Sequence, residues 1–310
     1  MVVKVEGLVK RYDKLVALDY LDLQVEEGEI FGLLGPNGSG KTTAINCILS
    51  LLKYDKGSIE IFGKKMGPNA YDIKKDIGII MQNVAVFDEL TVYENISYFC
   101  SLYIKNREEV KRLTKEAIEF VSLEDYKGFY PKKLSGGLLR RLNIACGIVH
   151  KPKLIILDEP TVAVDPQSRN KILEGIKKLN EDGVTIIYTS HYMEEVEQIC
   201  SNIAIIDKGR VIAKGTKDDL KAMISVGEKI RVEVFHIEEG MLEQLRKLPN
   251  VYSVEHSENL LEIKSKKGKN NLVNVLEFMQ KMNINFGKVI TEVPTLNDVF
   301  LEITGKELRD

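Results

Sequence analysis

The sequence predicts an α/β fold, with a core built on a mainly parallel sheet and a small α+β domain after it. Three observations predict this fold. Apolar runs such as LIIL and IIYTS alternate with amphipathic helical segments, which is typical of parallel strands buried on both faces. The stretch from about 84 to 150 shows mostly helical periodicity. From about residue 226, runs such as KIRVEVF and LLEIKS alternate as half-exposed strands do.

The elements follow one another in a regular order along the chain. Short strands and a helix that begins near Lys41 fill residues 1–83, and two amphipathic helices come next, in TVYENISYFCSLY and EEVKRLTKEAIEFVSL. The helix SRNKILEGIKKLNEDG then separates two buried strands, as a parallel crossover requires. In the last part, helices are expected near 238–248 and 271–283. The predicted domains are 1–222, with a helical part at about 84–150, and 223–310.

Composition and charge limit the class of protein. The chain has 310 residues, 44% hydrophobic and 29% charged, with a formal charge of -2, and this balance argues against nucleic acid as the main partner. The apolar runs are far shorter than the ~18 residues of a membrane span, and the N-terminus lacks the apolar core of a secretory signal. We therefore expect a cytoplasmic chain. The cysteines are expected to be reduced packing residues, because they lie far apart in apolar segments: Cys47, Cys100, Cys146 and Cys200.

The stretch GPNGSGKT lies between the strand IFGLLG and the following helix, and it matches a phosphate-binding loop in its required setting. Glycines let backbone N–H groups turn toward phosphate oxygens, and the helix end adds positive potential. Lys41 brings a charge to the outer phosphates, and Thr42 can ligate Mg²⁺. The alternative is an ordinary glycine-rich turn. The predicted nucleotide-binding residues are Gly35, Pro36, Asn37, Gly38, Ser39, Gly40, Lys41, Thr42 and Thr43.

Three more apolar strands end in polar residues. IGIIM runs into Gln82, LIIL into Asp158 and Glu159, and IIYTS into His191. If these strands are parallel, their carboxyl ends meet at one edge of the sheet, where ligands bind. Asp158 is then placed to hold Mg²⁺ directly or through water, with Gln82 beside it. Glu159 is the candidate to orient and deprotonate the attacking water, and His191 could donate to the γ-phosphate.

Each of these polar residues has a simpler reading. Asp158 and Glu159 could cap the turn that follows them, and EPT would suit such a turn. His191 could be an ordinary hydrogen-bonding residue at a strand end, and Gln82 a solvated strand terminus. The phosphate loop nearby favours the catalytic reading, because it brings the phosphate on which these groups would act.

A second anion-binding helix start lies in KKLSGGLLRRLNIA, at 132–145, where Gly136 and Gly137 follow Ser135 and precede apolar residues at helical spacing. This segment carries no base or magnesium ligand of its own. Such a site is best used on the nucleotide of another copy, so a second subunit is implied.

Taken in order, these residues resemble the nucleotide-binding subunit of an ATP-binding cassette (ABC) transporter, over residues 1 to about 222. The resemblance implies a P-loop NTPase core with an antiparallel β part and a helical subdomain, and ATP with Mg²⁺ as ligands. Tyr12 is similar to the aromatic residue that stacks on adenine, although packing would suit it equally. Gln82 is similar to the glutamine that senses the membrane partner and joins the metal site. Asp165 resembles the aspartate of the loop between subunits.

The resemblance also implies partners. Two such subunits, identical or paralogous, pair head to tail, so that Ser135, Gly136 and Gly137 of one complete the γ-phosphate site of the other. Bound ATP then holds the pair together, and hydrolysis releases it. A separate transmembrane permease is the second implied partner, and it would hold the chain at the inner face of the cell membrane. The resemblance implies neither nucleic acid nor direct membrane contact.

Three positions depart from the family pattern. LSGG at 134–137 resembles the family's signature sequence. Leu138 stands where glutamine commonly ends that sequence, so one side-chain contact to the ribose or the facing loop is expected to be lost. Ala163 and Val164 stand where glycine and leucine are frequent, which could alter communication across the dimer. Glu159 and His191 are both present, so active hydrolysis is expected.

The segments FDELTVYENISYF and PTLNDVFLEITG resemble ATPase subunits of bacterial drug, antibiotic-resistance and sodium-type exporters. The permease is expected where the Gln82 loop meets the helical part. Core packing is the alternative for each of the candidate contact residues, which are Phe87, Tyr93, Tyr98 and Phe99. The C-terminal domain could pack against its twin, regulate the subunit or stabilise it.

Two other functions fit the phosphate loop. One is a soluble ATPase of this fold that acts on ribosomes or DNA, but the chain lacks the tandem cassettes or coiled-coil insertions usual there. The other is a P-loop kinase for a small molecule, which would leave LSGG and the His191 strand without a purpose. A copurified membrane subunit would favour the transporter, and phosphorylation of a metabolite would favour the kinase.

Overall fold

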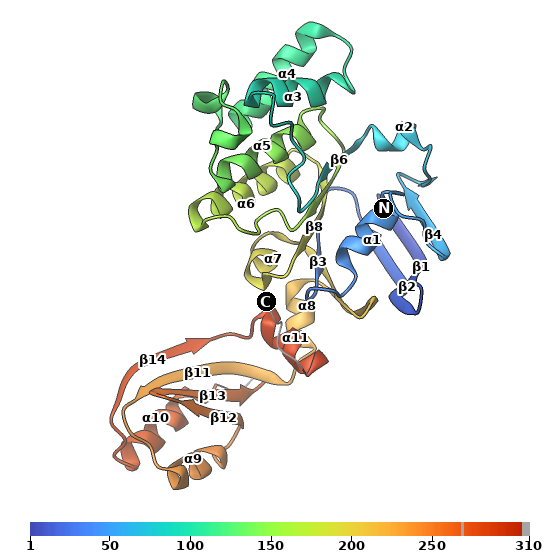
Figure 1. Cartoon of the computed structure of the whole chain (residues 1–310). Coiled ribbons are helices and arrows are strands. Elements are labelled where there is room, and N and C mark those ends of the chain that lie inside the picture. The colour runs from blue at the N-terminus through green and yellow to red at the C-terminus, as the bar shows by residue number, and fades with distance from the viewer. Residues whose placement is uncertain (268–269, 306–310) are drawn as a thin grey trace. The chain divides into compact units, whose positions relative to one another are not determined.

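The structure, a computed structural model, describes residues 1–267 and 270–305. The described chain divides into two compact units, Met1–Thr216 and a second unit that begins at Lys217 (Figure 1). The domain boundary expected at residues 222 and 223 falls at the end of helix α8, Lys217–Ala222. The last five residues of the expected second domain lie outside the described residues.

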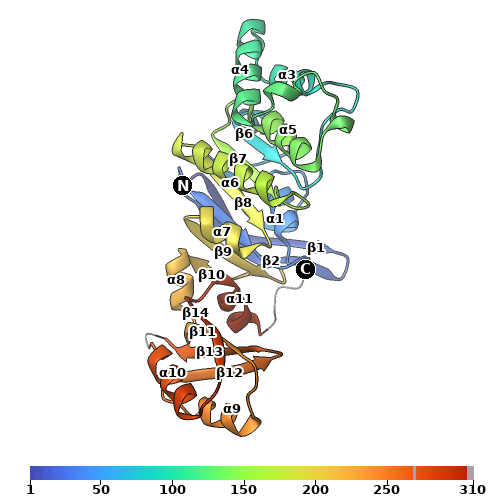
Figure 2. The same ribbon diagram turned by 90° about the vertical axis from the view of Figure 1, so that its left-hand side faces the viewer.

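A six-stranded sheet forms the centre of the first unit, in the order β10-β9-β3-β8-β7-β6. The strands β9, β3, β8, β7 and β6 run parallel to one another, and the edge strand β10 is antiparallel to β9. Helix α7 packs on β3 and β8, α5 on β6 and α1 on β7 (Figure 2). Burial on both faces explains why these strands read as continuous apolar runs. The strands are β3 (Ile30–Leu34), β6 (Ile77–Ile80), β7 (Leu154–Asp158), β8 (Thr185–Ser190), β9 (Asn202–Asp207) and β10 (Arg210–Gly215).

A second, antiparallel sheet has the order β2-β1-β4-β5 and shares one hydrophobic core with the parallel sheet. Its β2 begins at Leu15, earlier than the predicted strand LDLQV. The register between β1 and β2 shifts repeatedly, and Tyr20 has a positive φ of 51°. These irregularities interrupt the alternation of apolar and polar residues on which the prediction rested. The strands are β1 (Val3–Tyr12), β2 (Leu15–Val25), β4 (Lys56–Ile61) and β5 (Lys64–Lys65).

The helices of this unit include a helical region in which α3, α4 and α5 pack together. Thr91 and Glu94 form a reciprocal cap at the start of α3, and the Asn106 side chain caps α4. Among the described residues, no helix is both long enough and apolar enough to cross a membrane. The helices are α1 (Lys41–Ile48), α2 (Tyr71–Lys74), α3 (Val92–Ser101), α4 (Arg107–Phe120), α5 (Gly136–Ile148), α6 (Pro166–Glu181) and α7 (Met193–Ile199), with 3-10 turns at Glu124–Tyr126 and Pro131–Lys133.

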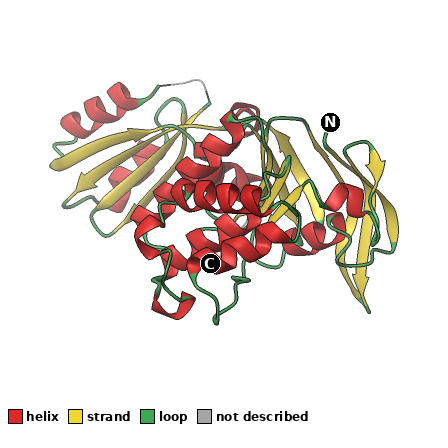
Figure 3. Cartoon of the chain, turned by 90° about the horizontal axis from the view of Figure 1, so that it is seen from above, coloured by secondary structure: helices red, strands yellow, loops and turns green. Residues whose placement is uncertain are grey.

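The second unit follows a β-α-β-β-α-β order with an antiparallel sheet, β12-β13-β11-β14, which is the ferredoxin-like arrangement. Figure 3 separates its helices from its strands by colour. The helices expected near 238–248 and 271–283 are present. Strand β14 was not predicted, because it lies at the sheet edge and is mostly exposed. The elements are β11 (Val226–Val234), α9 (Glu239–Arg246), β12 (Val251–Ser257), β13 (Leu260–Lys266), α10 (Leu272–Lys281), β14 (Phe286–Glu292) and α11 (Leu296–Thr304).

Together these elements confirm the predicted α/β core with its parallel sheet, antiparallel part and helical region, and the α+β unit after it. The four cysteines are free and buried, which agrees with their expected role in packing.

The buried thiols lead to a first prediction. Burial raises the pKa of Cys47 to about 11, and it also raises the pKa of Cys100, Cys146 and Cys200. A raised pKa leaves less reactive thiolate at neutral pH. We expect the native protein to resist Ellman's reagent and the urea-denatured chain to react at all four cysteines. Rapid labelling of any cysteine in the native protein would contradict this.

Candidate nucleotide site at the carboxyl edge of the parallel sheet

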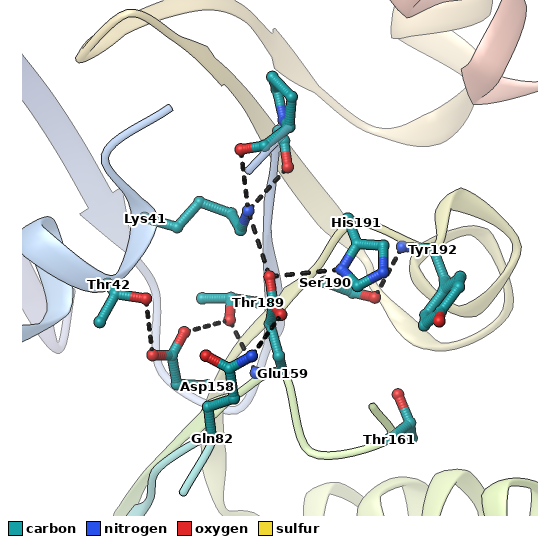
Figure 4. A network of polar contacts seen from close by, with 12 residues as sticks. Lys41, Thr42, Gln82, Asp158, Glu159, Thr161, Thr189, Ser190, His191 and Tyr192 are labelled. Atoms are coloured by element: carbon teal, nitrogen blue, oxygen red, sulfur yellow. Dashed lines mark hydrogen bonds and ion pairs between the residues drawn. The ribbon is translucent and has the colours of Figure 1, made fainter. Parts of the chain in front are cut away.

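The parallel sheet brings the predicted catalytic residues together, as the sequence suggested. The carboxyl ends of β3, β6, β7 and β8 lie at one edge because these strands run in the same direction. The strand β6 leads to Gln82, β7 to Asp158 and Glu159, and β8 to His191. Lys41 begins α1, the helix after β3. Figure 4 shows that their side chains point toward one another.

The loop between β3 and α1 holds Lys41 in place. Its Nζ donates to the carbonyls of Gly35, at 2.8 Å, and Pro36, at 3.2 Å, and the side chain is 5% exposed. Gly40 precedes it with φ of 109°, and a Cβ there would lie 2.7 Å from the Ala17 carbonyl. Only glycine suits that position. The ammonium group is therefore presented by a loop whose course depends on Gly40.

Thr42 and Asp158 bring a hydroxyl oxygen and a carboxylate oxygen side by side. Thr42 Oγ1 donates to Asp158 Oδ2 at 2.9 Å, and Thr189 Oγ1 donates to Asp158 Oδ1 at 2.6 Å. Asp158 is only 1% exposed. A carboxylate buried this deeply requires hydrogen bonds to both oxygens, and the two threonines provide them.

Glu159 lies at the centre of the site. Its Oε1 is 3.3 Å from Lys41 Nζ and 3.4 Å from His191 Nδ1, and its Oε2 accepts from Gln82 Nε2 at 3.4 Å. Its backbone has φ of 49°, and its N–H donates to both the carbonyl and the hydroxyl of Thr189. Non-glycine residues rarely adopt this conformation, and such strain is concentrated at functional sites.

A pocket of ≈ 500 Å³ opens beside Glu159. It includes most of the phosphate loop, Gln82 and the half-exposed ring of Tyr12, so the ring and the loop face one space. Sequence reasoning missed Leu15, Val16 and Lys208 in its lining. The first two belong to the part of β2 that was not predicted. Lys208 is in the turn between β9 and β10, where no sequence signal marks it.

The other predicted binding residues lie apart from this pocket. Ser135 and Gly136 are exposed at the start of α5, where Ser135 Oγ accepts from the Leu138 N–H at 3.4 Å. Asp165 caps α6 and accepts from the Ser168 N–H at 2.9 Å, and this bond lowers the pKa of Asp165. A Cβ on Gly137 would lie 2.4 Å from Ser168 Oγ. The starts of α5 and α6 thus pack against each other.

The three departures from the family pattern have different surroundings. Leu138 is half-buried in the first turn of α5, and the Val164 side chain is buried. Ala163 is exposed and has φ of 59°, which is the left-handed region that glycine favours. Its methyl group therefore strains the turn between Glu159 and Asp165.

We expect Ala163→Gly to stabilise the first unit. Removing the left-handed strain gains about 1–2 kcal/mol, and the added freedom of the unfolded chain costs about 0.4–1 kcal/mol. The net gain predicts a rise of about 2 °C in the thermal midpoint, measured by calorimetry. Ala117→Gly, within α4, is the control and should lower the midpoint. A lower midpoint for Ala163→Gly would contradict the prediction.

Comparisons with known proteins identify the family of this chain. The ABC transporter family model matches residues 18–162. The linearmycin resistance ATP-binding protein of Bacillus subtilis (strain 168) is 39% identical over 98% of this chain and 99% of its own length. The daunorubicin resistance ATP-binding protein DrrA3 of Streptomyces coeruleorubidus is 34% identical over 99% and 97%.

A solved structure extends the comparison. It is a dimeric ATP-binding cassette in a post-hydrolysis state with ADP and phosphate bound. It is 29% identical to this chain, with a TM-score of 0.64, and the match covers 69% of this chain and 98% of the cassette. The two relatives above match over almost their whole length, and this cassette matches the first unit. The chain therefore belongs to the ABC transporter family, as one of its ATP-binding and ATP-hydrolysing subunits.

Proposed function

We propose that this chain hydrolyses MgATP at Glu159, in a head-to-tail pair of subunits that drives a separate membrane permease in export. One observation carries the assignment of the reaction centre. A single buried carboxylate lies within 3.3 to 3.4 Å of a lysine, a histidine and a glutamine, each from a different segment. A carboxylate held by a lysine, a histidine and a glutamine beside a phosphate loop suits the transfer of a phosphoryl group to water.

The phosphates would bind over residues 35–43. The first backbone N–H groups of α1 have no partner within the helix, so they are available to phosphate oxygens. Lys41 donates hydrogen bonds to two loop carbonyls, and the outer phosphates would accept these hydrogen bonds in the nucleotide-bound state. Tyr12 would stack on adenine, since its exposed ring lines the same pocket.

The residues present also fit a magnesium ion. Thr42 and Asp158 offer neighbouring oxygens, which hard cations prefer. Gln82, exposed on the same pocket, is the third proposed ligand. Among residues 1–267 and 270–305, no three His, Cys, Asp or Glu side chains form a metal site. The ion would therefore depend on ATP and water for its other ligands. When bound, it neutralises charge on the phosphate oxygens.

Glu159 would act on the attacking water, and His191 would position the γ-phosphate. Glu159 accepts a proton as the water oxygen bonds to the γ-phosphorus, and the bond to the β-γ bridging oxygen breaks to leave ADP and phosphate. His191 Nδ1 is buried and faces Glu159 Oε1 at 3.4 Å without the alignment of a hydrogen bond, so the ring already points at the reaction centre. The ring is partly exposed, and it would donate to a γ-phosphate oxygen and keep the phosphate in line with the water.

The second subunit would complete the site from outside. Ser135 and Gly136 are exposed at the N-terminal end of α5, so they can reach the γ-phosphate of a partner. Asp165 is exposed beside them and would face the partner's phosphate loop. The dimeric solved cassette supports this pairing. Either an identical chain or a paralogue could be the partner.

The permease would dock where the Gln82 loop meets the helical region. Phe87 and Tyr98 form an edge-on ring pair with centroids 5.1 Å apart, and both rings are exposed. Tyr93 is exposed and Phe99 half-buried on the same helix. The loop is also tied to α5, because Arg140 donates to the carbonyls of Met81 and Gln82. These hydrogen bonds support a route by which movement of the permease reaches the start of α5, where Ser135 and Gly136 lie. The permease would also hold the chain at the inner face of the membrane.

The role of Glu159 is tested by Glu159→Gln, which keeps the shape of the side chain and removes the base. We expect ATP to bind, kcat to fall by about 100-fold or more, and a dimer to accumulate with ATP and Mg²⁺ in size-exclusion chromatography. Glu174→Gln, at an exposed position of α6, is the matched control. The head-to-tail model fails if the Glu159→Gln protein stays monomeric with ATP and Mg²⁺.

Tyr12→Ala tests the adenine contact. Stacking of a base on an aromatic ring contributes about 1–3 kcal/mol, so the Kd for ATP should rise about tenfold or more in titration calorimetry. Tyr12→Phe keeps the ring and should bind as the parent does. An unchanged Kd for the alanine variant would return Tyr12 to a packing role.

A further inference from the structure

Glu195 on α7 is a buried carboxylate outside the reaction centre. It is 3% exposed, and its Oε2 accepts three hydroxyl hydrogen bonds. The donors are Thr161 at 2.8 Å, Tyr188 at 2.7 Å and Ser190 at 3.0 Å. Thr161 follows Glu159 by two residues, and Ser190 directly precedes His191. One oxygen thus joins the segments that carry both proposed catalytic groups.

The other oxygen of Glu195 faces helix α6. Arg169 Nε lies 3.3 Å from Glu195 Oε1 without the alignment of a hydrogen bond. The same guanidinium lies over the Tyr192 ring, 4.7 Å from its centroid, and the Tyr192 and His191 rings are 4.1 Å apart. Arg169 is in the first turns of α6, which Asp165 caps. A continuous set of contacts therefore runs from the cap of α6 to the His191 ring.

Burial of the Glu195 carboxylate costs free energy unless its polar partners are all present. A buried carboxylate requires partners for both oxygens, and removal of one partner destabilises such networks more than loss of an exposed pair does. Burial and the neighbouring Glu195 raise the pKa of Tyr188, so the Tyr188 hydroxyl keeps its proton and remains a donor. Glu195 reaches no phosphate loop residue, and the reaction at Glu159 does not use it.

We propose that Glu195 is a positioning residue that couples the first turns of α6 to the orientation of His191. The proposal deepens the proposed function, because it rests on Asp165 facing a second subunit. A partner that shifts the cap of α6 would shift Arg169, and the Glu195 and Tyr192 contacts would pass that shift to His191. Formation of the pair and alignment of His191 would then be one event. Glu195 would thus link the position of the α6 cap to the orientation of His191, and it would take no part in the chemical step.

Glu195→Gln tests the proposal. The amide keeps the shape but removes the charge that faces Arg169, and its single carbonyl oxygen is a weaker acceptor for the three hydroxyl hydrogen bonds than the carboxylate is. We expect kcat to fall by about 10- to 100-fold through misplacement of His191, with KM for ATP within twofold of the parent, because the phosphate loop is untouched. Glu194→Gln, exposed on the same helix, is the control and should keep the parental kcat.

A double-mutant cycle separates coupling from general loss of structure. If Glu195 and Arg169 act as one unit, Arg169→Gln alone should lower kcat to a similar extent, and the double variant should be no slower than the slower single variant. Arg169 is partly exposed, so this variant serves if Glu195→Gln fails to fold. Multiplied losses in the double variant would overturn the proposal, and so would a parental kcat in either single variant.

The proposed function can fail separately. It would fail if the unsubstituted protein has no ATPase activity, or if Glu159→Gln does not form an ATP-dependent dimer. An active parent whose Glu195→Gln and Arg169→Gln variants match it would overturn only the role of Glu195.

Discussion

Parallel pairing of β6, β7, β8 and β3 brings residues from four distant segments to one edge, and Glu159 is where their side chains meet. Each strand is short and packed on both faces, so a change in register by one residue would exchange side chains of different size between two close-packed layers. The same packing that stabilises the sheet therefore also sets the distances around Glu159. The site depends on the sheet more than on the loops beside it.

Two residues just beyond the end of β7 have a strained, left-handed backbone. Glu159 has a left-handed backbone that is stabilised by hydrogen bonds to Thr189 on the neighbouring strand, and Ala163 has a positive φ four residues later. Both lie in the turn that connects the proposed base with Asp165. This turn carries the carboxylate of Glu159 at the edge of the phosphate loop, and the strain at Ala163 lowers the stability of the unit by an amount that glycine would restore.

Buried polar side chains connect the moving parts of the proposed cycle. Arg140 joins α5, which begins at the exposed signature turn, to the Gln82 loop. Glu195 joins the turn after Glu159, the end of β8 and the first turns of α6. Both side chains contact carbonyls, hydroxyls or charged groups on other elements. Networks of this kind specify one arrangement strongly, because each partner that is lost leaves an unsatisfied buried group.

The residues in sequence order already determined the α/β class, the phosphate loop, the polar ends of the strands and the helical region, because these depend on local periodicity and glycine patterns. The extent of β2, the edge strand β14 and the lining by Leu15, Val16 and Lys208 depend on tertiary structure, since bulges and exposed edges hide the pattern of burial. The roles of Glu195 and Arg169 were equally hidden. A glutamate in an amphipathic helix looks solvated until the fold buries it among three hydroxyl groups, and only tertiary packing decides which of two neighbouring glutamates, Glu194 or Glu195, is buried.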